Sequence, residues 1–141
     1  MSKMAVVFWS GTGNTAAMAE AVAEGGREAG AEVEMLTAAE FSADQVKDFD
    51  RIAFGCPAMG AEVLEEGEFD PMFTECEGVL SGKKIALFGS YGWGTGEWME
   101  SWEDRCHGAG AVLAAGSVIC QETPGEEALQ ECRAMGKALA G

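Results

Sequence analysis

The sequence predicts an α/β fold in which a parallel sheet is covered by helices on both faces. Five short segments rich in Val, Ile, Leu and Phe recur along the chain, and segments with helical periodicity lie between them. Four of the five are continuously apolar, which is typical of strands buried on both faces. Strands that alternate with helices build parallel sheets, so a doubly wound parallel sheet is expected.

The expected strands lie at residues 4–9, 31–36, 52–55, 85–89 and 111–120, and only the second has an alternating pattern. A first helix is expected from about 14 to 29, with a core-facing stripe at Met18, Ala21, Val22 and Gly25. Gly25 and Gly26 should weaken this helix by about 1 kcal/mol each relative to alanine.

Four further helices are expected around 42–47, 70–80, 97–108 and 126–140. Ser42 and the turn at 123–126 supply the start signals of two of them. Trp98 and Trp102 are four residues apart on the fourth helix, so both are expected in the core.

Length, charge and cysteine usage limit the possible functions. A chain of 141 residues has room for one domain, here 1–141, and its 24 acidic and 9 basic residues give a net charge of −15. This charge argues against nucleic acid and anionic membranes and favours a basic protein partner, although it would also serve solubility alone. The sequence has five widely spaced cysteines and lacks any long apolar run, so a cytoplasmic protein with reduced thiols is expected.

The segment WSGTGNT at 9–15 joins the first strand to the first helix and is rich in hydrogen-bond donors. Gly11 and Gly13 free backbone N–H groups, and the side chains of Ser10, Thr12, Asn14 and Thr15 add donors beside the positive end of the helix dipole. The segment has no lysine or arginine, so its donors are neutral and suit a phosphate monoester.

The same segment satisfies G-x-G-x-x-A, the dinucleotide fingerprint, through Gly11, Gly13 and Ala16. This match is weak, because the chain is short and its second strand ends in Met35, Leu36 and Thr37 without an acidic residue. The sequence also lacks G-x-x-x-x-G-K-[ST], which excludes a nucleoside-triphosphatase P-loop.

Two more loops follow the third and fourth strands and should meet the first at one sheet edge. The loop at 90–96 places Tyr91 and Trp93 among glycines, where Trp93 is expected to stack on a ligand ring. The loop at 56–67 places Met59, a polarizable side chain, next to Gly60 and ahead of an acidic run.

These loops together resemble the flavodoxins, in particular the short-chain group. The resemblance covers nearly the whole chain and is most specific in WSGTGNT, GCPAMG, EVLEE and LFGSYGWGTGEWM. The short-chain assignment depends on the lack of a long insertion within 111–120. The resemblance implies a sheet of five parallel strands in the order 2-1-3-4-5 and one non-covalent flavin mononucleotide (FMN).

By this resemblance the protein is a low-potential one-electron carrier and not an enzyme, cycling its FMN between oxidised, neutral semiquinone and anionic hydroquinone states. It would be a monomer that serves redox partner proteins with basic docking faces. The acidic run Glu62, Glu65, Glu66, Glu68 and Asp70 would meet those faces. A net charge of −15 and a phosphate site without basic residues should penalise the anionic hydroquinone and lower its potential.

The resemblance also assigns roles to single residues. Ser10, Thr12, Asn14 and Thr15 would hold the phosphate, with Trp9 near the ribityl chain. Met59 and Trp93 would flank the ring, Glu62 would bind its N3 edge, and the peptide between Gly60 and Ala61 would flip on reduction. Pro57 departs from the pattern, since some relatives place there a serine that reaches the phosphate. The expected cofactor site comprises Trp9, Ser10, Gly11, Thr12, Gly13, Asn14, Thr15, Pro57, Ala58, Met59, Gly60, Ala61, Glu62, Ser90, Tyr91, Gly92, Trp93 and Gly94.

Rival readings of the fold fail at their functional residues. A response-regulator receiver needs an aspartate at the end of the third strand, where this chain has Gly55 and Cys56. A low-molecular-weight phosphatase needs a cysteine in the 10–15 loop, which has none. His107 is expected to be a solvated or capping residue near the end of the fourth helix. A flavin-binding module without carrier function stays open as the alternative.

Overall fold

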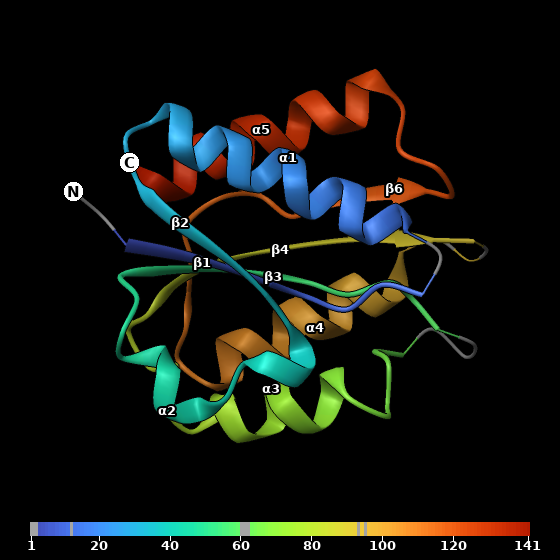
Figure 1. Ribbon diagram of the computed structural model, residues 1–141. Helices are drawn as coiled ribbons and strands as arrows, with labels where there is room; N and C mark the ends of the chain where they lie inside the picture. The colour runs from blue at the N-terminus through green and yellow to red at the C-terminus, as the bar shows by residue number, and fades with distance from the viewer. Residues whose placement is uncertain (1–2, 12, 60–62, 93, 95) are drawn as a thin grey trace.

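The computed structural model describes residues 3–11, 13–59, 63–92, 94 and 96–141. A parallel sheet crosses the middle of the molecule, with helices on both of its faces (Figure 1). Its strands are β1 (Lys3–Phe8), β2 (Glu32–Thr37), β3 (Arg51–Gly55), β4 (Lys84–Tyr91), β5 (Val112–Leu113) and β6 (Val118–Gln121). The order β2-β1-β3-β4-β5 confirms the predicted topology, and all pairs are parallel.

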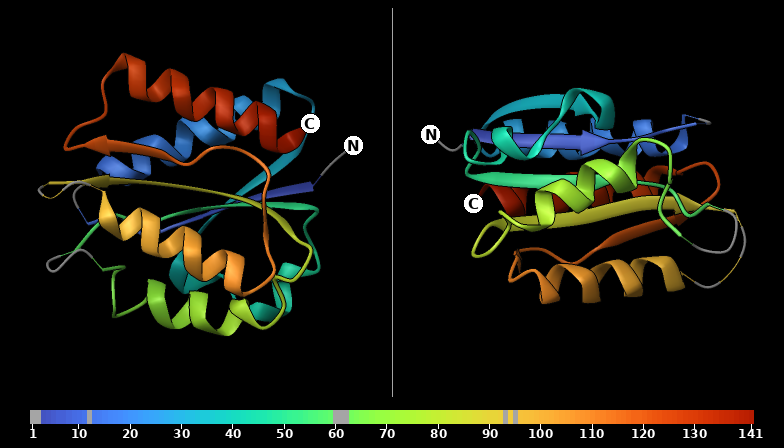
Figure 2. Two further views of the ribbon diagram at one scale, coloured as in Figure 1. Left: turned by 180° about the vertical axis from the view of Figure 1, so that it is seen from behind. Right: turned by 90° about the horizontal axis from the view of Figure 1, so that it is seen from below.

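The helices form two layers. Helices α1 (Asn14–Glu28) and α5 (Glu126–Ala140) cover one face, and α3 (Phe69–Glu77) and α4 (Glu97–Gly108) cover the other (Figures 1 and 2). The short α2 (Ala43–Val46) and a 3₁₀ turn at Ala38–Glu40 join the second layer. The strands present alternate residues to two separate cores, as continuously apolar strands should: Ala5 and Val7 to one, and Met4 and Val6 to the other.

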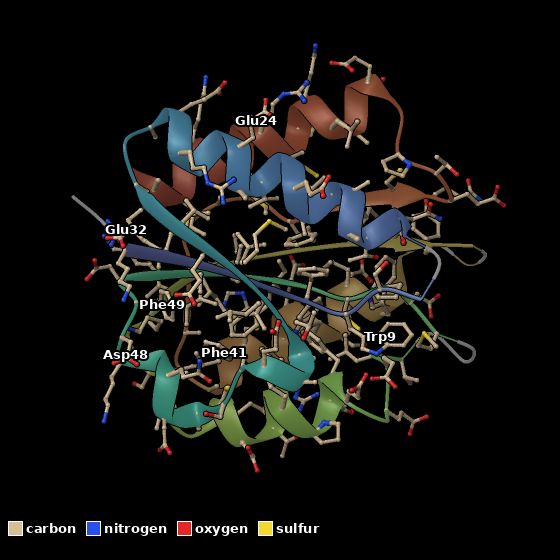
Figure 3. All side chains as sticks on the ribbon, in the orientation of Figure 1. Trp9, Glu24, Glu32, Phe41, Asp48 and Phe49 are labelled. Atoms are coloured by element: carbon tan, nitrogen blue, oxygen red, sulfur yellow. The ribbon has the colours of Figure 1, made fainter. Side chains whose placement is uncertain are left out.

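The core under α3 and α4 is mainly aromatic. Trp98 and Trp102 are 2% and 1% exposed, which confirms their expected core position. Phe54 meets Phe69 and Phe73 edge to face, and each of those two rings meets Trp102 edge to face, with ring centroids 5.1 to 6.5 Å apart. Toward α2, Phe41 and Phe49 pack with their ring centroids 6.2 Å apart (Figure 3).

Gly25 lies where α1 and α5 are in close contact, a role that the sequence pattern did not indicate. A Cβ atom on Gly25 would lie 1.9 Å from the carbonyl oxygen of Arg133, and one on Gly136 would lie 2.1 Å from that of Val22. Each glycine therefore admits the backbone of the opposite helix. The expected weakening of α1 by Gly25 is the cost of a close helix contact rather than a defect.

The fifth strand corrects the sequence prediction, because 111–120 is two strands rather than one. Leu113 pairs with Ile85, and Val118 pairs with Phe88. Between these two pairs β4 advances by three residues, whereas the segment from β5 to β6 advances by five. The two extra residues bulge out of the pairing between β5 and β6.

The five cysteines are free, as expected: four are buried and Cys120 is partly exposed. Burial raises the pKa of Cys56, Cys76, Cys106 and Cys132 to about 12, so these stay protonated thiols. His107 is exposed near the end of α4, as predicted. Within the described residues, no helix has the length and apolar character needed to cross a membrane.

Candidate functional site

The loops that follow β1, β3 and β4 lie at the carboxyl edge of the sheet (Figure 1). Residues of these segments and Glu122 line an open cavity of about 320 Å³. Small-molecule sites range from about 300 to 1,000 Å³, so this volume suits a compact ring system. The residues that line it are Trp9, Gly11, Asn14, Pro57, Ala58, Met59, Ser90, Tyr91, Gly92 and Glu122. The walls are mostly apolar or aromatic, with a few polar groups, as in sites for flat aromatic ligands.

The 10–15 loop is shaped by Ser10 and Gly13. The Ser10 hydroxyl accepts the backbone N–H groups of Gly13 at 3.1 Å and Ala16 at 3.3 Å. Gly13 is the N-cap of α1 with φ 94°, a left-handed conformation that favours glycine. The loop thus turns sharply into the positive end of a fifteen-residue helix, where a negatively charged group is stabilised.

Thr15 in the first turn of α1 and Ser90 of β4 join the helix to the sheet. Their hydroxyl oxygens lie 3.0 Å apart in a hydrogen bond, and the two residues are 1% and 4% exposed. Ser90 and Tyr91 were expected in a loop, but they belong to β4, which continues beyond residue 89 because it pairs with β6 as far as Gln121.

The start of the loop after β3 is fixed to the sheet. The N–H of Cys56 donates to the carbonyl of Phe88 at 3.1 Å, and that of Ala58 donates to the carbonyl of Ser90 at 2.9 Å. The N–H of Met59 then donates to the carbonyl of Val63 at 2.9 Å. Pro57, Ala58 and Met59 are consequently held as one wall of the cavity.

The acidic turn, defined here as residues 65–68, is an ordered structure. The Glu65 carboxylate accepts the N–H groups of Gly67 at 2.7 Å, Glu68 at 2.7 Å and Phe69 at 2.8 Å, and so caps the start of α3. Partial burial raises the pKa of Glu65, but these three donors lower it by more, so the pKa lies below its usual value. Glu65 therefore has a structural role that its place in the acidic run did not suggest.

Other members of the acidic run also have partners within the chain. Asp70 pairs with Arg105 at 2.8 Å, and Arg105 pairs with Glu77 at 2.8 Å, which ties α4 to α3. The Glu68 carboxylate accepts the indole N–H of Trp9 at 3.0 Å. Glu66 is exposed.

Glu122 lines the cavity but was not among the predicted site residues. Its N–H donates to the carbonyl of Tyr91 at 2.7 Å, which brings it to the rim beside Gly92. It is the sole non-glycine residue with positive φ, at 57°, in the part of the chain that the structure describes. The signal available in the sequence was its position just past the strand that ends at this same edge.

The structure brings nine of the predicted site residues together around the cavity and describes four more outside its lining. Ser10 and Gly13 line an adjoining hollow of about 360 Å³, Thr15 is buried below the loop, and Gly94 is exposed with φ 91°. Five predicted residues lie outside the described part of the chain: Thr12, Gly60, Ala61, Glu62 and Trp93.

Comparison with known proteins points to one family. A family model described as flavodoxin matches residues 6–136. The chain is 47% identical to a flavodoxin of Clostridium beijerinckii over 97% of this chain and 99% of that protein, and 45% identical to a flavodoxin of Megasphaera elsdenii over 96% of each. The solution structure of the two-electron reduced Megasphaera elsdenii flavodoxin superposes with a TM-score of 0.90 over 97% of this chain and 98% of that one. A flavodoxin from the domain Archaea, 29% identical, superposes with a TM-score of 0.85 over 98% of this chain and 96% of that one.

Proposed function

Because the chain belongs to the flavodoxin family, whose members are low-potential electron carriers that bind FMN, we propose that the cavity at the carboxyl edge of its sheet holds the flavin ring. The 10–15 loop would hold the phosphate. The observation that carries this assignment is the convergence of three loops on one cavity with apolar walls next to a helix start. Like its relatives, the protein is an electron-transfer protein and not an enzyme.

The residues present fit the group. Pro57, Ala58 and Met59 from the loop after β3 line the cavity together with Tyr91 at the end of β4 and Gly92 directly after it, and the space suits a flat ring. Asn14 and the backbone of the 10–15 loop supply neutral donors for the phosphate, and Ser10 stabilises the turn that presents them. As part of this proposal, the roles that the resemblance implies are kept for Thr12, Gly60, Ala61, Glu62 and Trp93.

The described residues that line the site carry no positive charge, and this affects the reduction potential of a bound flavin. FMN would supply one-electron chemistry when bound, and a reduction step that takes up no proton would add negative charge to the site. Around the two hollows, no lysine or arginine is found among the described residues that line them. Glu122 lines the cavity, and Glu68 lines the adjoining hollow. Their negative charges would disfavour an anionic flavin ring and lower the potential of the reduction step that forms it.

Flavodoxins deliver electrons to redox partner proteins, and we infer the kind of face that this one meets. With a net charge of −15, it should dock on basic faces as a cytoplasmic monomer of one domain, without binding nucleic acid or membranes. Glu66 is exposed on the acidic turn and suits this contact better than Glu65, whose carboxylate is occupied. Partner binding should therefore weaken as salt is added.

Redox titration of the FMN-loaded protein tests the function and separates it from a passive flavin-binding module. A carrier should show two well-separated one-electron potentials, with the second far below that of free FMN. A passive binder would show potentials close to those of the free cofactor. An apo-protein that stays colourless with added FMN would overturn the assignment.

A further inference from the structure

Trp9 is fixed to the sheet at one end and to the acidic turn at the other. Its backbone N–H donates to the carbonyl of Gly55 at 3.0 Å, which continues the pairing of β1 with β3. Its indole N–H donates to the Glu68 carboxylate at 3.0 Å. Figure 3 shows the side chain at the carboxyl edge of the sheet, where the three loops meet.

The indole forms a wall between two hollows. Trp9 lines both the cavity assigned to the flavin ring and the adjoining hollow of about 360 Å³, and Glu68 lines only the second. The ring also packs against the 10–15 loop, since a Cβ atom on Gly11 would lie 3.1 Å from the Cη2 atom of Trp9. A change in the angle of this ring would alter the cavity and the loop together.

The position of Glu68 is itself set by Glu65. The Glu65 carboxylate accepts the Glu68 N–H at 2.7 Å while it caps α3, so the backbone of Glu68 belongs to the start of a helix rather than to a free loop. A side chain that extends from an anchored backbone loses less conformational freedom when it accepts a hydrogen bond. The acidic turn thus presents a fixed acceptor to the indole.

We propose that Glu68 is a positioning residue of the cofactor site, which holds the Trp9 ring in place through the indole N–H and so pre-organises the cavity and the 10–15 loop for FMN. This inference rests on the proposed function, because it assigns the cavity to FMN. Two effects of Glu68 oppose each other at this site. Its negative charge repels the FMN phosphate, whereas its hydrogen bond keeps the wall in place.

Four single variants separate these two effects. E68Q and E66Q each remove one charge from the same turn, but the glutamine in E68Q keeps an oxygen that can accept the indole N–H. E68A and E66A also remove one charge each, and only E68A removes the acceptor. W9F keeps an aromatic ring and removes the indole donor, which completes a double-mutant cycle with E68A.

The dissociation constant of FMN from the apo-protein, measured by flavin fluorescence quenching, should rise about three- to tenfold in E68A relative to E66A, as expected for one exposed charge-assisted hydrogen bond. E68Q and E66Q should agree within about twofold, since both keep the wall. In the W9F background, E68A should have no larger effect than E66A. In the apo-protein, the indole NMR signal that is missing in W9F should shift in E68A and stay in place in E66A.

Equal dissociation constants for E68A and E66A would overturn the positioning role, and so would an E68A effect that persists in W9F. An indole signal that E68A leaves unchanged would show that the hydrogen bond is not formed in solution. A wild-type protein that does not bind FMN would overturn the proposed function and this inference with it. That outcome is distinguishable, because the indole shift in the apo-protein does not depend on FMN.

Discussion

Replacing Gly25 with alanine tests the close contact between α1 and α5. The new Cβ would lie 1.9 Å from the Arg133 carbonyl oxygen, whereas ordinary contact begins at 3.4 Å, so the helices would have to separate by about 1.5 Å. The clashing atom belongs to a helical backbone and cannot rotate away. Separation would loosen the core between these helices and the sheet, which includes Met18, Val22 and Met135.

Two opposing terms set the magnitude. Alanine is favoured over glycine in a helix by about 1 kcal/mol, which would stabilise α1. Forcing a methyl group into a filled contact costs about 1–3 kcal/mol, and a backbone clash belongs at the upper end of that range. The net expectation for Gly25→Ala is a loss of about 2 kcal/mol in the free energy of unfolding.

Urea denaturation of the apo-protein, followed by far-UV circular dichroism, measures this loss without the contribution of bound FMN. Gly136→Ala should behave like Gly25→Ala, since its Cβ would lie 2.1 Å from the Val22 carbonyl oxygen. Gly108→Ala is the matched control, because that helical glycine is exposed and its Cβ would meet nothing within 4 Å. If Gly25→Ala is as stable as the wild type, the tight packing inferred here is wrong.

Three further predictions concern the acidic turn, the buried hydroxyl pair and the thiols. Glu65→Ala should lower the free energy of unfolding by about 1 kcal/mol at pH 7. Because the pKa of Glu65 is lowered in the folded protein, its contribution to stability is lost as the pH falls through that pKa. The difference between the variant and the wild type should therefore vanish in urea titrations carried from pH 7 down to pH 3. Thr15→Val should cost about 1–2 kcal/mol in the same assay by leaving the Ser90 hydroxyl unpaired, and the double variant with Ser90→Ala should cost less than the sum of the two single changes. A thiol reagent at pH 8 should modify Cys120 first and the four buried cysteines only after denaturant is added; rapid modification of several thiols in the native protein would contradict the buried, protonated state.

The sequence predicted the fold well wherever a pattern was long. The helices α4 and α5 begin and end where expected: α5 follows the start signal at 123–126, and α4 carries Trp98 and Trp102 one helical turn apart on its buried face. Short elements were less accessible: the helix expected around 42–47 is the single turn Ala43–Val46, and the 3₁₀ turn at Ala38–Glu40 was not predicted. Both have capping boxes whose few residues give no periodicity to detect.

The site was predictable in outline but not in its internal contacts. Loops at one sheet edge follow from strand order, which is why Trp9, Met59 and Tyr91 were placed together. The hydrogen bond from Trp9 to Glu68 spans 59 residues, and the bond between Thr15 and Ser90 spans 75. Such partners depend on side-chain positions in three dimensions, and no local spacing encodes them.

The interruption between β5 and β6 makes the edge of the sheet that they form a poor template for pairing with a strand of another molecule. Among the described residues, β5 offers two residues of regular backbone and β6 offers four, and the bulge separates them. The opposite border, β2, carries the exposed Glu32 and Glu34. A strand from another molecule would meet an interrupted edge at β5 and β6 and negatively charged side chains at the β2 edge. Both borders of the sheet therefore disfavour its extension by a strand from a second copy of the chain.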